Sequence, residues 1–447
     1  MDLNKASREE LLAVITEQQT VIAEQQTIIR CLQGRVAQLE GRLTKGGPKG
    51  MPGLKPKRAK QAQPKKGRKR RPRGFGRVRC SAPTERVVHA VDHCPECNTR
   101  LLGGSVKHLH EVIDIALQPV RVTEHVFIER ECPLCRERLV PKDALNGVVM
   151  GKQRLGTNLV SLMATLREEG RLPFRTIQWY LETFHQLALS VGAIVAAVQR
   201  VGEVGQSAAQ AVLDRIRDSA VVSADETGWR QDGENGYAWT FSTASERYFV
   251  WRGRNKEVVD EVLGEEFDGV LVSDFYAAYN HYPGLHQRCW AHLLRDIHEL
   301  KELYPQDVGL QRWAGEVHEV YKQAKDFSHP DERGRLQAQR DFESRLLGLC
   351  QPFLEDQTAA QRRLCNRISR FLQELFVFVA YPEVPADNNG AERSLRHLVT
   401  SRKISGGTRS PQGTTAKMTL ATLFGTWRVQ GLNPFLSCSQ LLISPQV

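Results

Sequence analysis

Residues 220–225 read Ala-Val-Val-Ser-Ala-Asp, and residues 269–274 read Gly-Val-Leu-Val-Ser-Asp. Each stretch is an apolar run that ends in an aspartate, a pattern typical of a buried strand whose last residue reaches the edge of a sheet. Between the two runs, β-rich segments at 237–243 and 247–252 precede a helical pattern at 255–263. Three strands, a helix and a returning strand predict a mixed sheet in which Asp225 and Asp274 end neighbouring parallel strands.

A third carboxylate lies in residues 387–396, which read Asp-Asn-Asn-Gly-Ala-Glu-Arg-Ser-Leu-Arg. Asp387 is well placed as the N-cap of a helix in which Glu392 and Arg396 share one face. A strand at 287–290, a helix at 292–304 and a helical, charged insertion at about 305–380 separate this helix from the earlier strands. The order of elements fits a multidomain α/β protein with a ribonuclease-H-like core.

Carboxylates that converge from two strand ends and one helix predict a site for divalent cations. Mg²⁺ prefers oxygen ligands and is held by a few carboxylates together with water and phosphate oxygens. Two such ions about 4 Å apart activate water and stabilise the leaving oxygen in phosphodiester chemistry. We therefore expect Asp225, Asp274 and Glu392 to bind two Mg²⁺ (or Mn²⁺) ions and to cut or join nucleic acid. Glu226 is expected to point to the other side of the extended chain.

Positive charge is concentrated in one segment of the 447-residue chain, whose formal net charge is +11. Residues 42–79 contain 16 Lys or Arg and no Asp or Glu, which leaves 11 − 16 = −5 for the rest. Such a Gly- and Pro-rich basic segment predicts a disordered arm that binds DNA phosphates, although a solubilising linker is the alternative. The expected DNA contacts are Lys65, Lys66, Arg68, Lys69, Arg70 and Arg71 in this arm, and Arg393, Arg396, Arg402 and Lys403 near Glu392.

The first 44 residues carry a heptad seam of apolar residues that runs from Leu11 to Leu43. One row of the seam is β-branched and the other ends in leucines, an arrangement that favours a parallel dimeric coiled coil. Gln18 and Gln25 lie in the seam, where a polar group can fix the register. A helix packed on its own chain is the alternative.

Two Cys-x-x-Cys pairs, Cys94 with Cys97 and Cys132 with Cys135, are separated by 34 residues. Four thiolates in two tight pairs suit a tetrahedral structural Zn²⁺. The insert reads as short strands, such as 112–115 and 120–128, so a zinc ribbon is predicted. A redox pair is the alternative, which the duplication of the motif disfavours.

The helical pattern that follows includes candidate helices at 175–184 and 190–201, joined by a short turn. Such a pair resembles a helix-turn-helix, whose second helix would enter the major groove, although most helix pairs are structural. The expected domains are therefore a coiled coil (1–44), a basic linker (45–80), a zinc ribbon (81–145), a helical DNA-binding region (150–212), a catalytic domain (213–432) and a C-terminal tail (433–447).

Hydropathy gives no indication of a membrane protein. No stretch approaches 18 uninterrupted apolar residues, and the first 30 residues lack a signal-peptide pattern. We expect a soluble, cytoplasmic bacterial protein that associates with the nucleoid when it is bound to DNA.

Four segments together resemble the transposases of the insertion-sequence-66 family. They are Ala-Asp-Glu-Thr at 224–227, Ser-Asp-Phe-Tyr-Ala-Ala-Tyr-Asn at 273–280, Cys-Trp-Ala-His at 289–292, and the stretch 387–396. The resemblance implies a DDE catalytic core, with Asp225, Asp274 and Glu392 as the metal-binding triad. It also implies double-stranded DNA as partner, both transposon ends and target, a homodimer or higher oligomer, and accessory transposition proteins. Gly390 departs from the alanine usual in the family, and Trp290 and His292 are evenly divided between DNA contact and core.

The implied reaction frees a 3′-hydroxyl at an element end by hydrolysis and then transfers that hydroxyl to target DNA. Both steps are in-line displacements at one site, and no nucleotide-binding loop is found in the sequence. A zinc-containing DNA-binding regulator with a non-catalytic core, and a metal-dependent nuclease without joining activity, are the alternatives.

Overall fold

The structure, a computed structural model, describes residues 85–103, 105–107, 109, 120–141, 144–150 and 153–443. The chain divides into two compact units, Met1–Ile113 and Asp114–Val447, and each is described here by itself. The coiled coil predicted at 1–44 and the basic linker predicted at 45–80, with its six DNA-contact residues, lie outside the described residues. The division between the units falls inside the predicted zinc ribbon.

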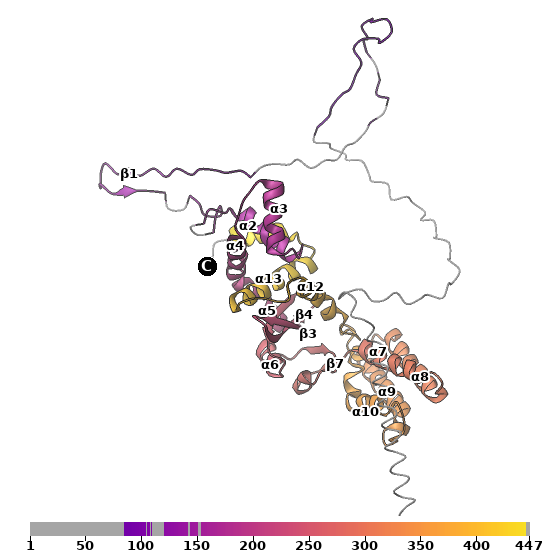
Figure 1. Cartoon of the computed structure of the whole chain (residues 1–447). Helices are drawn as coiled ribbons and strands as arrows, with labels where there is room; N and C mark the ends of the chain where they lie inside the picture. Colours follow the sequence, from indigo (N-terminus) through magenta and orange to yellow (C-terminus); the bar gives the residue numbers. More distant parts are fainter. Residues whose placement is uncertain are drawn as a thin grey trace, which may run out of the picture. The chain divides into compact units, whose positions relative to one another are not determined.

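A five-stranded sheet in the order β5-β4-β3-β6-β7 forms the centre of the second unit (Figure 1). Strand β3 pairs antiparallel with β4 and parallel with β6; β4 pairs antiparallel with β5, and β6 parallel with β7. The return of β6 beside β3 confirms the mixed sheet predicted from the two apolar runs. The strands are β3 (Val221–Gln231), β4 (Glu234–Ser242), β5 (Arg247–Arg252), β6 (Val270–Ser273) and β7 (His286–Arg288).

Helices cover both faces of this sheet. Trp239 belongs to the core under α5 (Gln206–Arg217) and α6 (Glu257–Leu263). Its neighbour Ala238 belongs to the core under α12 (Asn389–Ser405) and α13 (Pro411–Val429), because successive side chains of a strand point to opposite faces. A sheet that is buried on both faces explains why the central strands read as nearly continuous apolar runs.

The insertion between β7 and α12 is helical, as predicted. Its helices gather into one bundle near β7 in Figure 1, with a separate core that includes the buried Trp290, Trp313 and Leu346. The helices are α7 (Trp290–Leu303), α8 (Val308–Asp326), α9 (Glu332–Cys350), α10 (Arg362–Arg370) and α11 (Val377–Ala380).

A further helical layer joins residues from both ends of the second unit. Helices α2 (Thr157–Glu168), α3 (Phe174–His185) and α4 (Val191–Val204) share a core with α13 and α14 (Pro434–Ile443). The prediction of a C-terminal tail at 433–447 is therefore wrong for 434–443, because α14 buries Cys438 and Leu442.

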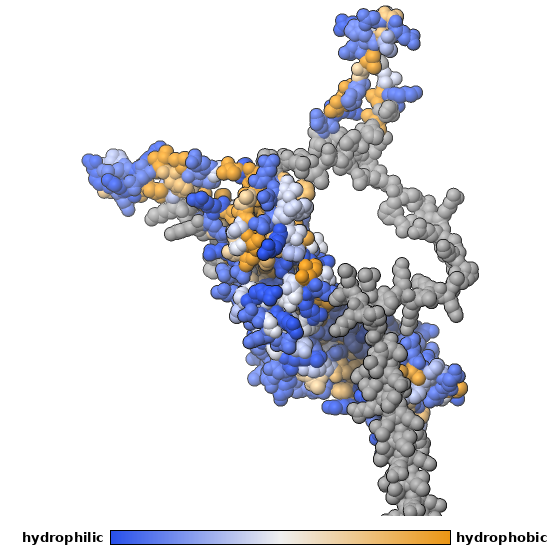
Figure 2. Space-filling model, viewed as in Figure 1, coloured by the Kyte–Doolittle hydropathy of each residue, from blue (hydrophilic) through white to orange (hydrophobic). Residues whose placement is uncertain are grey.

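The strand predicted at 120–128 is also wrong. These residues are extended but pair with no strand that the structure describes, and the first strands are the two-residue β1 (Arg130–Glu131) and β2 (Arg138–Leu139). Their side chains stay exposed, 89% for Val122 and 75% for Val126, so no apolar face is buried to favour pairing. Figure 2 shows the apolar surface along this segment, beside the position of β1. The strand predicted at 112–115 lies outside the described residues.

Among the described residues, no helix is both long enough and apolar enough to cross a lipid bilayer.

Candidate active site

Asp225 lies within β3, and Asp274 directly follows β6, the neighbouring strand that runs in the same direction. The prediction that Asp225 ends its strand is wrong, because β3 continues to Gln231 in its pairing with β4. In the pairing of β3 with β6, the last two partners are Ser223 and Val272. Asp225 lies two residues after Ser223, and Asp274 lies two residues after Val272. The carboxylate of Asp225 accepts a 2.9 Å hydrogen bond from the backbone N–H of Glu226, and that of Asp274 accepts one of 2.8 Å from Tyr276. The sheet therefore places the two predicted ligands side by side.

Helix α12 brings Glu392 to the same place through the residue that precedes the helix. The side-chain amide of Asn388 donates a 2.7 Å hydrogen bond to the carbonyl of Ala224, and its backbone N–H lies 3.1 Å from Cys289 Sγ. The prediction that Asp387 is the N-cap is wrong, because Asn388 occupies that position; Asp387 instead accepts a hydrogen bond from the backbone N–H of Asn389. The side-chain amide of Asn388 thus holds the start of α12 against β3.

The carboxylates influence one another's charge. Burial is the largest cause that raises the pKa of Asp225 from 3.8 to about 8, and the negative charges of Glu226, Asp274 and Glu392 raise it further. A carboxylate that shares a buried site with other carboxylates resists ionisation unless positive charge is supplied. The site thus has the electrostatics of a cation-binding site.

Glu226 takes part in this charge arrangement, although strand alternation alone excluded it. Its side chain is buried, accepts a 2.9 Å hydrogen bond from Tyr279 Oη and pairs with Arg254 at 2.8 Å. Burial is the main cause that raises the pKa of Glu226, and the charge of Asp274 adds to it. No periodicity rule could have found this contact, because Tyr279 and Arg254 reach Glu226 from other elements.

The start of α7 supplies a histidine to the site. His292 Nε2 lies 3.6 Å from Glu392 Oε1, whereas Trp290, two residues earlier, is fully buried and donates to the carbonyl of Leu375. The sequence left these two residues evenly divided between DNA contact and core. The structure separates them: Trp290 belongs to the insertion core and His292 faces Glu392.

Three polar atoms at this position are buried without a hydrogen-bond partner: Glu392 Oε1, His292 Nδ1 and Asn388 Oδ1. Buried polar atoms without a hydrogen-bond partner are uncommon in proteins and need a physical explanation. Oxygen donors of this kind suit Mg²⁺ or Mn²⁺. Within the described part of the chain, no three Asp, Glu, His or Cys side chains form a ready-made metal cluster. The donor set fits a hard cation, provided that side-chain rotation closes the carboxylates around it.

The four basic residues predicted near Glu392 differ in their surroundings. Arg402 donates a 3.0 Å hydrogen bond to Thr227 Oγ1 and another to the carbonyl of Gly228, so it ties α12 to β3. Arg393, Arg396 and Lys403 are exposed. Arg402 is thus engaged within the protein, and the other three are free to meet a ligand.

The two Cys-x-x-Cys pairs fold into turns of the same kind. Cys94 N–H donates to the carbonyl of Thr99 and Asn98 N–H to that of Cys94, both at 2.9 Å. The second turn repeats both bonds, from Cys132 to Glu137 at 2.8 Å and from Arg136 to Cys132 at 2.9 Å. In each turn the residue four places after the first cysteine is left-handed, with φ of 52° at Asn98 and 61° at Arg136.

One thiol of each turn has surroundings that favour the thiolate. Hydrogen bonding to Thr99 lowers the pKa of Cys97, and hydrogen bonding to Cys135 lowers the pKa of Cys132. Because metals bind the thiolate form of cysteine, these turns are suited to zinc. The pair Cys94 and Cys97 belongs to the first unit and the pair Cys132 and Cys135 to the second.

The predicted pair of helices is present as α3 and α4, but α4 is packed on the inner side. Ile194, Val198 and Val201 are buried, and Gly202 lies against α13, where an added Cβ would come within 2.6 Å of Ala416. The exposed polar side chains of α4 are Arg200 and Glu203. The reading of bases by α4 therefore stays a prediction.

Fold and site together define a mixed α/β protein with a buried acidic site between two parallel strands and a helix. The family profile described as "Transposase IS66 family" matches residues 152–416, more than half of the chain, including Asp225, Asp274 and Glu392. The chain belongs to the IS66 transposase family.

A relative gives a further comparison. The uncharacterized protein y4jO of Sinorhizobium fredii (strain NBRC 101917 / NGR234) is 31% identical over 167 residues, which are 37% of this chain and 50% of that protein. The chain therefore spans half the length of this relative.

Proposed function

We propose that this protein is a DDE transposase that frees the 3′ ends of an insertion sequence and transfers them to target DNA. The observation that carries the proposal is the placement of Asp225 and Asp274 at the same level of two parallel strands, with Asn388 holding the start of the Glu392 helix against β3. The negative charges of Asp274 and Glu392 contribute to the raised pKa of Asp225. These residues come from β3, the end of β6 and α12, which is the order expected for a ribonuclease-H-like core. The family supports a transposase role, and the site supports this chemistry for it.

Asp225, Asp274 and Glu392 would hold two Mg²⁺ or Mn²⁺ ions. When bound, these ions would activate the attacking oxygen and stabilise the leaving oxygen of the phosphodiester. His292 would hold the carboxylate of Glu392 in position from the start of α7, since its Nε2 lies 3.6 Å from Glu392 Oε1. Asn388 would fix the distance between α12 and β3 through its bond to Ala224.

Glu226 would add a negative charge next to Asp225. Its bonds to Tyr279 and Arg254 keep it in place, so its carboxylate raises the pKa of Asp225 without leaving its own position. Ionisation of Asp225 is thereby linked to the arrival of positive charge. We infer that the site binds divalent cations more readily as pH rises toward 8.

Other parts of the chain would serve binding and assembly. We propose that Cys94, Cys97, Cys132 and Cys135 hold a structural Zn²⁺ ion, because the two turns share one backbone geometry. Residues 1–44 would pair two protomers, and the basic arm with Lys65, Lys66, Arg68, Lys69, Arg70 and Arg71 would bind double-stranded DNA. Two paired protomers suit a reaction in which two transposon ends are handled together. We also propose accessory proteins encoded beside this one, and this proposal is supported by the family alone.

The test uses the full chain with duplexes that carry the two DNA ends flanking its coding region. Wild type should nick these ends and join them to a target plasmid in Mg²⁺, and Asp225→Asn, Asp274→Asn and Glu392→Gln should each lower the rate by at least about 1000-fold. All three variants should bind the duplex as wild type does. Asp232→Asn, an exposed aspartate on the turn after β3, is the matched control and should react normally.

Two outcomes would contradict the proposal. Joining that survives in the three variants would mean that these carboxylates do not carry the chemistry, as the regulator alternative requires. Nicking without joining, when a pre-cleaved end with a free 3′-hydroxyl is supplied, would identify a nuclease.

A further inference from the structure

A pocket between β5, α12 and α13 is lined by three arginines. Its volume is about 190 Å³, and Arg247, Arg393, Arg428, Phe249 and Phe424 are among the residues that line it. Among the described residues that line it, none is acidic. We refer to it as the arginine pocket.

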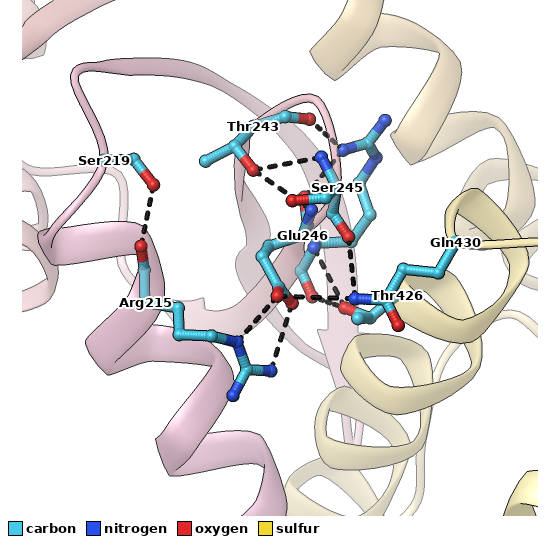
Figure 3. A network of polar contacts seen from close by, with 8 residues as sticks. Arg215, Ser219, Thr243, Ser245, Glu246, Thr426 and Gln430 are labelled. Atoms are coloured by element: carbon cyan, nitrogen blue, oxygen red, sulfur yellow. Dashed lines mark hydrogen bonds and ion pairs between the residues drawn. The ribbon is translucent and has the colours of Figure 1, made fainter.

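The backbone holds Arg247 in this position. Its guanidinium donates to the carbonyls of Thr243 and Glu246, and its own N–H donates a 3.0 Å bond to Thr426 Oγ1. The carboxylate of Glu246 accepts bonds of 2.7 and 3.3 Å from Arg215 (Figure 3). The adjacent carboxylate is thus hydrogen-bonded to Arg215 rather than to Arg247.

The other two arginines differ in their partners. Arg428 pairs with Glu169, whereas Arg393 is exposed at the pocket. Burial is the main cause that lowers the pKa of Arg247, and the positive charge of Arg393 lowers it further. Two guanidinium groups that repel each other across a pocket create a place where an anion is stabilised.

Helix α13 comes close to β5 at this point because residue 425 is glycine. An added Cβ at Gly425 would lie 3.3 Å from Cβ of Arg247 and 3.4 Å from the ring of Phe249. A glycine inside a helix costs about 0.5–1 kcal/mol relative to alanine. The close approach lets Arg247 from β5 and Arg428 from α13 line one small pocket.

Arg393 directly follows Glu392 on α12, so one helix supplies a residue to the pocket and a residue to the carboxylate site. We propose that the arginine pocket binds a backbone phosphate of the DNA strand whose neighbouring phosphodiester lies at Asp225, Asp274 and Glu392. The inference rests on the proposed function for the source of the phosphate. Arginine presents a planar fork of donors that matches phosphate oxygens, and bonds of this kind are among the strong ones.

The first measurement uses inorganic phosphate as the probe on the full chain. Phosphate, compared with sodium chloride of equal ionic strength, should raise the melting temperature of wild type and of Arg393→Lys, which keeps the charge. The rise should be lost in Arg393→Gln. Arg333→Gln, an exposed arginine on α9 outside the pocket, is the matched control and should respond as wild type does. An equal rise in Arg393→Gln and wild type overturns the proposal.

The second measurement uses a random-sequence duplex and fluorescence anisotropy at several salt concentrations. Arg393→Gln should bind about tenfold more weakly, and its plot of log K against log salt should be shallower by about 0.9. Arg333→Gln should keep the wild-type slope. Equal slopes in Arg393→Gln and wild type also overturn the proposal that the arginine pocket binds a DNA phosphate.

Failure of this inference is distinguishable from failure of the proposed function. If wild type joins DNA ends while Arg393→Gln binds phosphate and DNA normally, the proposal of phosphate binding in the arginine pocket is wrong and the transposase proposal stands. If Arg393→Gln loses phosphate and DNA binding while wild type joins nothing, the proposal of phosphate binding stands and the proposed chemistry is wrong.

Discussion

The side-chain amide of Asn388 donates a 2.7 Å hydrogen bond to the carbonyl of Ala224, across 164 residues of sequence. Ala224 directly precedes Asp225, and Asn388 directly precedes the helix that carries Glu392. The bond is fully buried, so water does not compete for it. This amide thus joins the strand and the helix that supply two of the three proposed metal ligands, close to those ligands.

Asn388→Ala should destabilise the protein by about 1–3 kcal/mol, because the carbonyl of Ala224 loses its buried donor. The same change should reduce DNA joining more strongly than it reduces DNA binding, since the ligands shift relative to each other. Urea unfolding and the joining assay measure the two effects. Asn389→Ala, at the partly exposed next position, is the matched control and should stay within about 0.5 kcal/mol of wild type. Equal behaviour of the two variants would mean that the amide has no positioning role.

Asp225 should make stability depend on pH. Its pKa of about 8 in the folded chain lies above the ordinary 3.8, mainly through burial, so the native state keeps a proton that the unfolded chain releases. The stabilisation from this proton is complete below about pH 4 and is lost as pH rises toward 8. In the presence of a chelator, the melting temperature of wild type should therefore fall relative to Asp225→Asn between pH 5 and pH 8.

Asp232→Asn, which changes an exposed aspartate, should follow the wild-type pH curve. Added Mg²⁺ should raise the melting temperature of wild type at pH 8 far more than that of Asp225→Asn. Parallel curves for wild type and Asp225→Asn would show that Asp225 is ionised in the folded state at neutral pH.

The sequence predicted the parts of the site that depend on local pattern. The apolar runs before Asp225 and Asp274 read as strands because both faces of the sheet are buried, and the capped stretch before Glu392 read as a helix. Contacts made by single side chains across the fold left no periodic signal. The bond from Asn388 to Ala224, the pairing of Glu226 with Tyr279, and the placement of His292 beside Glu392 are of this kind.

The failures also have local causes. The alternating residues at 120–128 looked like a strand, but a strand requires a partner, and no neighbouring segment in the described residues supplies one. The predicted C-terminal tail contains a ten-residue helix, α14. Its stability comes from burying Cys438 and Leu442 beside α2, a long-range contact that composition does not reveal.

Zinc should bind with a stoichiometry of one ion per chain and be lost when any one of its four ligands is removed. Cys94→Ser and Cys132→Ser should each abolish zinc in the purified protein, measured by elemental analysis, because a tetrahedral thiolate site fails with three ligands. Cys438→Ser, which changes a buried cysteine of α14, is the control and should retain the metal. Full zinc content in Cys94→Ser would exclude the two-turn site.

A buried ion pair joins α2 to α13. Removing one of its two charges should destabilise the protein more than removing both. Lys417 Nζ lies 2.6 Å from Glu168 Oε2 and His397 Nε2 lies 3.7 Å from the same atom. Burial raises the pKa of Glu168, but Lys417 and His397 together lower it to about 2. Lys417→Met leaves this buried carboxylate without its lysine partner, so it should cost about 3–5 kcal/mol in urea unfolding. Glu168→Gln combined with Lys417→Met should recover most of the loss, because no unpaired charge remains. Arg312→Gln, which breaks the exposed pair with Glu316, should cost less than about 0.5 kcal/mol. A double variant as unstable as Lys417→Met would show that the attraction between the two charges, rather than the penalty of an unpaired one, holds these helices together.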